Sequence, residues 1–130
     1  MEEGKVVIVP ISEGGSNSEG FLLGYVERAY DSMSVVKTIF DTTWTSAVRI
    51  KKDGLDALLS GGLNPSLTLI PSSARIAPGD RVYNADSRFP YGMILGEVKS
   101  LGSHSEQTLQ SAVLAPGFDL NAVRTVLILK

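Results

Sequence analysis

Two short strand-like segments of nearly the same sequence each contain a central glycine, and this repeat constrains the fold more than any other feature. The first copy is residues 22–27 (LLGYVE) and the second is residues 94–99 (ILGEVK), with Gly24 and Gly96 at the same place. A glycine inside a strand lowers its stability and usually marks a β-bulge, a barrel corner or the close approach of another backbone. Two such units in one chain predict two small β-barrels.

Length and charge bound the remaining possibilities. A chain of 130 residues suffices for one domain, or for two very small domains that share an interface. Hydrophobic residues make up 43% of the chain and charged residues 20%, which is typical of a globular protein. Twelve basic and fourteen acidic side chains leave a net charge of −2, so no broad positive field attracts phosphate backbones. Nucleic acid is therefore not an expected partner.

The chain contains no cysteine, which excludes thiolate metal sites, thiol catalysis and disulfides. No apolar run approaches the roughly 18 to 20 residues that a membrane-spanning helix requires. The first residues are acidic, whereas a signal peptide begins with basic residues. We therefore expect any membrane anchor to lie outside this chain.

Strand signals dominate the sequence, and nearly every candidate strand is bounded by Gly, Pro, Asn, Asp or Ser. This spacing is typical of an all-β sandwich or barrel. The predicted fold class is all-β, with two small six-stranded-type β-barrels packed together. The expected strands cover residues 5–11, 21–30, 34–40, 45–51, 67–70, 81–84, 93–101, 109–114 and 125–130.

The predicted division places the first barrel in residues 1–71 and the second in residues 72–130, with strand 5–11 completing either barrel. Residues 6–9 and 126–129 are apolar on both faces of their strands. A soluble protein normally covers such a surface, so we expect these strands at the junction of the barrels, paired with each other or under a partner. Residues 12–20 are rich in glycine and serine and predict a flexible connection, natural or engineered.

The alternation of side chains supports a sheet with one solvent-exposed face and one buried face. In the second copy of the repeat, the charged Glu97 and Lys99 must face water, which turns Ile94, Gly96 and Val98 inward. By the same parity, the first copy turns Leu22, Gly24 and Val26 inward and Tyr25 and Glu27 outward, and the strand 45–51 turns Val48 and Ile50 inward and Arg49 and Lys51 outward.

One segment allows two interpretations. Leu55, Leu58 and Leu59 stand at helical spacing, yet Gly61 and Gly62 end the pattern after barely two turns. A helix of that length is unstable without packing. The segment is predicted to be a short strand or a single helical turn.

Catalytic groups are sparse. Two β-barrels also occur in chymotrypsin-like proteases, which need a histidine before the aspartate and the serine in the chain. The only histidine, His104, lies near the end of the chain in a Gly-Ser-His-Ser stretch, so we expect an exposed loop residue. Asp80 follows Pro78 and Gly79, and an aspartate in such a turn usually binds its own backbone. No metal site and no cofactor are expected.

One cluster has the composition of a contact surface. Arginine and aromatic side chains are common interface anchors because they offer large, fairly rigid area with a polar edge. The alternative is that Phe89 plugs one end of a barrel while the arginines are solvated. Trp44 allows a similar choice between a barrel lid and a ligand platform. The candidate partner-binding residues are Arg81, Tyr83, Arg88, Phe89 and Tyr91, and the candidate structural glycines are Gly24, Gly79, Gly92 and Gly96.

The chain carries, in this order, the motifs LGYV (23–26), SVV (34–36) leading to FD (40–41), AVRI (47–50), LLSG (58–61), IAPGDRV (76–82), FPYGMILGEV (89–98), VLAP (113–116), Asp119 and VLI (126–128). In their order and spacing, these motifs resemble the extracytoplasmic β-domain of the MreC family of bacterial rod-shape-determining proteins. The resemblance spans most of residues 21–130. One loop departs from the family pattern, because family members usually carry a glycine-rich Thr-Ser-Gly stretch where this chain has residues 84–88 (NADSR).

The resemblance implies a non-enzymatic scaffold of the cell-wall elongation complex, on the outer side of the bacterial cytoplasmic membrane. It implies binding to the elongation-specific penicillin-binding transpeptidase and to other shape-determining proteins, together with self-association. The family's transmembrane helix and coiled coil are not in this chain. Two alternatives stay open at this stage: a degenerate protease-like barrel, and a module that binds sugar or peptide strands through Tyr83, Phe89 and Tyr91.

Overall fold

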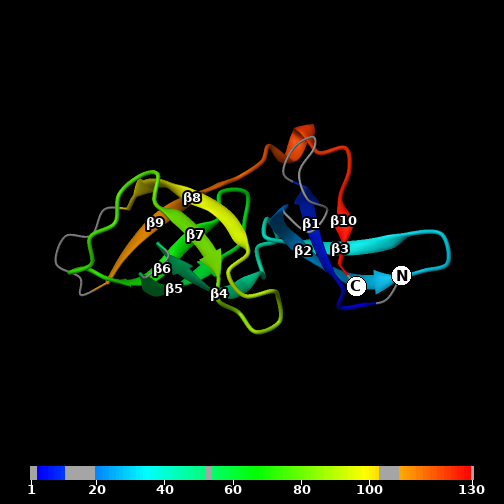
Figure 1. The fold of residues 1–130 in the computed structure, drawn as a ribbon, viewed down its shortest axis with the longest axis horizontal. Coiled ribbons are helices and arrows are strands. Elements are labelled where there is room, and N and C mark those ends of the chain that lie inside the picture. Colours follow the sequence, from blue (N-terminus) through cyan, green and yellow to red (C-terminus); the bar gives the residue numbers. More distant parts are fainter. Residues whose placement is uncertain (1–2, 11–19, 52–53, 103–108, 130) are drawn as a thin grey trace.

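A computed structural model describes residues 3–10, 20–51, 54–102 and 109–129 and shows a chain built from strands (Figure 1). The all-β prediction is confirmed. One turn of 3-10 helix, η1 (Leu120–Ala122), begins where the Asp119 carboxylate accepts a hydrogen bond from the Asn121 amide at 3.0 Å. The strands are β1 (Val6–Pro10), β2 (Gly20–Ala29), β3 (Ser34–Thr38), β4 (Thr45–Ile50), β5 (Leu55–Ser60), β6 (Ser66–Pro71), β7 (Arg81–Asn84), β8 (Ile94–Leu101), β9 (Leu109–Pro116) and β10 (Leu127–Ile128).

Six strands form a closed barrel. The pairing runs β4–β5–β6–β9–β8–β7 and returns to β4, and every pair in the ring is antiparallel. A barrel this narrow leaves an interior that side chains fill completely. The sequence expectation of a six-stranded barrel is therefore confirmed for this unit.

The second unit is a sheet in the order β10–β1–β2–β3 within the described residues. The two terminal strands pair with each other, through Val7 opposite Ile128 and Ile8 opposite Leu127, which is one of the two alternatives that their apolar faces predicted. The sheet joins the barrel through one parallel pair, Phe21 opposite Ile94. Figure 1 shows the barrel and this sheet side by side.

The strand pairing crosses the domain boundary that the sequence predicted between residues 71 and 72. β4 pairs with β7 and β6 pairs with β9, so the closed barrel takes strands from both sides of that boundary. Without β7 and β9, the three strands β4–β6 would form a sheet with two open edges, whereas the closed ring leaves none. β1 lies between β10 and β2 and does not enter the barrel. We propose that the units are residues 45–116 and, for the second sheet, residues 6–38 with 127–128.

The two copies of the glycine repeat occupy equivalent places. β2 and β8 each carry a bulge at the residue before the glycine, because the partner strand pairs with Gly24 and then Leu22, or with Gly96 and then Ile94. A Cβ atom on Gly24 would overlap the Lys37 carbonyl oxygen. A Cβ atom on Gly96 would overlap the Ala115 carbonyl oxygen in the same way. In both copies, glycine lets a neighbouring strand approach closely next to a bulge.

The bulge shifts the side-chain alternation that the sequence predicted. Ile94, expected inside, is half-buried, while the bulged Leu95 is fully buried. An extra residue on one strand reverses the parity of the residues beside it. Away from the bulge the alternation is confirmed, since Val48 and Ile50 are fully buried in β4.

The ambiguous leucine segment is strand β5. It pairs with β4 over its whole length and with β6 at three positions. Its buried side chains, Ala57 and Leu59, follow strand alternation rather than the helical spacing of the leucines. The neighbouring strands therefore decide the conformation of this segment.

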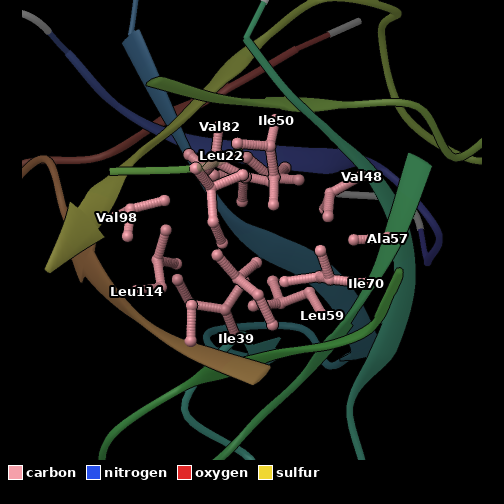
Figure 2. Packing of buried hydrophobic residues seen from close by; sticks show 14 of the residues in the cluster. Leu22, Ile39, Val48, Ile50, Ala57, Leu59, Ile70, Val82, Val98 and Leu114 are labelled. Carbon is pink, nitrogen blue, oxygen red and sulfur yellow. The ribbon is translucent and has the colours of Figure 1, made fainter. Parts of the chain in front are cut away.

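The barrel core includes residues of the second sheet. Val48, Ile50, Leu59, Ile70 and Leu114 point into the barrel interior from its own strands (Figure 2). Leu22 of β2 and Ile39, just after β3, belong to the same buried cluster and are fully buried. Trp44, 2% exposed, is part of this core too, which fits the predicted lid and not a ligand platform. The barrel core thus extends to residues of the second sheet.

Replacing either repeat glycine with alanine should destabilise the protein, because the added methyl group meets backbone that cannot rotate away. Gly24→Ala and Gly96→Ala should each lower the free energy of unfolding by about 1–3 kcal/mol in urea titrations. Ser100→Ala, on the exposed end of β8, is the control and should change it by less than about 0.5 kcal/mol. Wild-type stability in both glycine variants would contradict the close approach.

Candidate partner-binding surface

The loop between β7 and β8 is organised by one buried amide. Asn84, the last residue of β7, is 0% exposed. Its Nδ2 group lies 3.0 Å from the Asp86 carbonyl oxygen, 3.1 Å from that of Phe89 and 2.8 Å from that of Pro90. Its Oδ1 atom accepts a hydrogen bond from the Asp86 amide at 3.0 Å. The side chain thus forms hydrogen bonds with backbone groups of the loop that no neighbouring strand binds, and it fixes the path of residues 85–92.

A carboxylate in the loop attaches it to β4. The Asp86 side chain accepts hydrogen bonds from Arg88 Nε and Nη2, each at 2.9 Å, from the Arg88 amide at 3.0 Å and from the Ala47 amide at 3.3 Å. Arg88 Nη2 also donates to the Thr45 carbonyl oxygen at 2.7 Å. The hydrogen bonds from Arg88 are the main cause that lowers the pKa of Asp86 to about 2.

Three aromatic rings pack together where the loop meets the second sheet. Phe89 stacks on Trp44 with ring centroids 5.4 Å apart and an interplanar angle of 13°, and it lies 6.2 Å from the ring of Tyr25 in β2. The Arg88 guanidinium lies 5.1 Å from the centre of the Phe89 ring. Phe89 is 6% exposed. It is thus part of the core between the units, as the alternative interpretation of this residue had it.

Tyr91 lies on the outside of the barrel and is 72% exposed. Its hydroxyl oxygen accepts a hydrogen bond from Arg49 Nη1 at 2.6 Å, and the same guanidinium donates to the Asp56 carboxylate at 3.1 Å. The Arg49 Cζ atom lies 5.9 Å from the centre of the Tyr91 ring. Tyr83 stands opposite Arg49 on the neighbouring strand and is half-buried. These four side chains form a fixed polar and aromatic surface over β5, β4 and β7.

Arg81 lies apart from this surface, at a cleft of about 460 Å³ between the barrel and β2. Glu97, its cross-strand neighbour, lines the cleft beside it. Phe21, Pro116 and Gly117 form apolar parts of the wall. The cleft therefore offers a cation, an anion and apolar surface together.

The five candidate residues do not form one cluster. Phe89 belongs to the core and Arg88 to the attachment of the loop, while Tyr91 and Tyr83 share the outer surface and Arg81 borders the cleft. They share one sequence neighbourhood, but the bends of the loop send them in different directions.

Sequence reasoning missed Arg49, Asp56, Tyr25 and Asn84. Arg49 and Tyr25 stand at outward positions of their strands, and alternation alone assigns such residues to solvent. Their contacts come from segments 42 and 64 residues away in the chain, Tyr91 and Phe89. The stretch Asn84-Ala85-Asp86 did contain a signal, because Asn and Asp bind nearby backbone in turns.

The remaining candidates are local turn residues. Gly79 (φ +96°) and Gly92 (φ +80°) occupy the third position of turns closed by the amides of Asp80 and Met93, and such turns favour glycine there. Asp80 binds its own turn as predicted, accepting from the Ala77 amide at 2.8 Å. His104 lies outside the described residues.

Within the described ranges, no group of three or more His, Asp or Glu side chains is placed to hold a metal ion. The same part of the chain contains no helix long and apolar enough to cross a membrane. The described part of the chain thus combines a closed barrel and a second sheet with aromatic and guanidinium groups exposed on the outside. These features define a small β-barrel protein with a preorganised outer surface.

Comparison with known proteins identifies the family. The family model for the barrel core of the rod shape-determining protein MreC matches residues 2–130. The chain therefore belongs to the MreC family, as its sequence motifs predicted. A comparison with curated proteins gave no match.

Solved structures agree with this assignment. The crystal structure of MreC from Pseudomonas aeruginosa is 25% identical, with a TM-score of 0.79 over 99% of this chain and 81% of that chain. Another solved MreC is 25% identical, with a TM-score of 0.80 over 99% of this chain and 71% of that chain. A chain of the complex between Penicillin-Binding Protein (PBP2) and MreC from Helicobacter pylori shares the fold at 23% identity, with a TM-score of 0.66 over 96% of this chain and 85% of that chain.

The lowered pKa of Asp86 predicts an acid-sensitive contribution to stability. A carboxyl group with a depressed pKa in the folded state stabilises the fold above its unfolded pKa near 3.8, and this contribution is lost as the pH falls toward about 2. Its size is on the order of 2 kcal/mol. Asp86→Asn should lower the free energy of unfolding at pH 6 and flatten its decline between pH 4 and pH 2.

The measurement is urea unfolding at a series of pH values, followed by circular dichroism. Asp31→Asn, in the exposed turn between β2 and β3, controls for the loss of one negative charge. A pH profile of Asp86→Asn that runs parallel to the wild-type profile would show that the carboxylate does not stabilise the loop.

Proposed function

We propose that this domain is a non-enzymatic scaffold that maintains bacterial cell shape by binding a penicillin-binding transpeptidase of the cell-wall elongation complex. The observation that carries the proposal is the fold shared, over nearly the whole chain, with a chain of the H. pylori complex between PBP2 and MreC. Family membership supports a role in cell shape. The scaffold works on the outer side of the cytoplasmic membrane, held there by an anchoring segment outside these residues.

The outer surface around Tyr91 is the proposed contact site. Its ring is largely exposed and already held by Arg49, so little side-chain entropy is lost when a partner covers it. Tyrosine and arginine are common among residues that dominate binding energies. Arg81 borders a separate cleft, which can receive a projecting side chain of the partner.

Binding alone can raise the activity of the penicillin-binding transpeptidase. A scaffold that binds the active conformation of an enzyme more tightly than the inactive one shifts the population toward the active form. No reacting group of the scaffold is needed. This proposal agrees with a contact surface made of aromatic and guanidinium groups.

Replacing Tyr91 tests the contact site. Tyr91→Ala should weaken binding to the elongation-specific penicillin-binding protein of the same bacterium at least tenfold, about 1.4 kcal/mol, measured by isothermal titration calorimetry. The fold should be unaffected, because the side chain is 72% exposed.

Tyr30→Ala is the matched control, since Tyr30 is 55% exposed but directly follows β2, away from this surface. It should bind like the wild type. Unchanged binding by Tyr91→Ala together with a loss in Tyr30→Ala would move the contact site to the second sheet. Absence of any binding by the wild-type chain would contradict the proposed function itself.

A further inference from the structure

The apolar part of the contact between the two units does not favour one angle between them. Leu22 and Ile39 of the second sheet enter the core of the barrel. Burial of apolar surface favours this contact but depends on area and not on angle. The backbone contacts between them are few among the described residues: Phe21 pairs with Ile94, and the Gly62 amide donates to the Ile39 carbonyl oxygen at 3.3 Å. These features hold the units together, and a directional side-chain contact would fix their angle more closely.

The aromatic stack of Tyr25, Trp44 and Phe89 supplies a directional contact at the same buried cluster as Leu22 and Ile39. Tyr25 stands three residues beyond Leu22 on β2 and contacts both Trp44 and Phe89, with centroid distances of 5.7 and 6.2 Å. Aromatic pairs prefer particular offsets and angles, so this contact is directional where the apolar plug is not. Figure 1 shows the β7–β8 loop, which carries Phe89, at the junction of the barrel and the second sheet.

The position of Phe89 depends on Asn84. The Asn84 amide donates to the carbonyl oxygens of Phe89 and of Pro90, which belong to the two successive peptide bonds that follow the ring-bearing residue. Asn84 is fully buried, so water cannot replace these hydrogen bonds when the side chain is removed. Its own strand is part of the barrel wall, and it therefore ties Phe89 to the barrel.

The other ring of the stack is tied to the same loop. Trp44 directly precedes β4, and Arg88 and Asp86 bind the backbone of β4 at Thr45 and Ala47. Trp44 Nε1 donates to the buried Ser46 hydroxyl at 3.0 Å, which fixes the indole ring. Both rings that receive Tyr25 are thus set by one network in the barrel.

We propose that Asn84, Asp86, Arg88 and Phe89 form an orientation latch that fixes the angle between the barrel and the second sheet, with Asn84 as its positioning residue. The latch acts through the Phe89 ring on Tyr25 of β2. When it is released, the shared core keeps the units attached but the second sheet samples a range of angles. This inference does not depend on the proposed function, because it concerns the geometry of the unbound chain.

Spin labels across the two units test the latch. The chain has no cysteine, so Asp31→Cys in the second sheet and Lys99→Cys in the barrel, both exposed, accept nitroxide labels at two sites only. Double electron–electron resonance then measures the distance distribution in the otherwise wild-type chain and in Asn84→Ala. The wild type should give one narrow distribution, and Asn84→Ala should at least double its width.

Gln110→Ala is the matched control. Gln110 is a buried amide of the barrel that also binds two carbonyl oxygens, those of Pro71 and Ala74, but it does not contact the latch. The Gln110→Ala substitution should destabilise the barrel and leave the width of the distance distribution unchanged. Circular dichroism establishes that each variant is folded, and the emission maximum of Trp44, the single tryptophan, should shift to longer wavelength only in latch variants.

Two results would overturn the proposal. One is a folded Asn84→Ala with the wild-type distance distribution, and the other is equal broadening in Gln110→Ala, which would indicate a general loss of stability. If Asn84→Ala does not fold, Phe89→Leu is measured instead. It keeps an apolar side chain in the core but removes the stack, and a wild-type distribution in this variant would equally overturn the latch.

Discussion

The structure depends on a hydrophobic core that neither unit completes alone. Leu22 and Ile39 come from the second sheet, yet they are fully buried in the cluster that fills the barrel. A barrel of six short strands has little interior volume, so removal of two large side chains would leave a cavity at one end. The second sheet has a small cluster of its own around Val7, Leu23 and Val26. Because β2 sends Leu22 to one core and Leu23 to the other, its bulge connects the two.

This shared core explains the position of the glycine repeat. The bulge before Gly24 allows two consecutive leucines to reach two different cores, and the glycine lets β3 approach from the other side. The bulge before Gly96 gives the barrel wall the same local shape where β9 approaches. Bulges of this kind raise the twist of a strand, which closing a small barrel requires.

Much of the fold could be predicted from local sequence. Turn residues and alternation located most strands, and the two-sided apolar pattern of residues 6–9 and 126–129 predicted that the terminal strands pair with each other or lie under a partner. The domain boundary could not be located this way, because the pairing of β4 with β7 and of β6 with β9 is set by distant partners. The candidate surface shows the same limit. Tyr91 and its loop have a clear composition, but only the fold shows that Phe89 turns inward and that Arg49 supports Tyr91.

Because Leu22 and Ile39 complete the core of the barrel, the barrel and the second sheet should unfold together. Differential scanning calorimetry of the whole chain measures whether they do. The shared core predicts a single transition whose calorimetric and van't Hoff enthalpies agree. Two resolved transitions, or a van't Hoff enthalpy well below the calorimetric value, would show that the barrel and the second sheet unfold independently and that the shared core does not couple them.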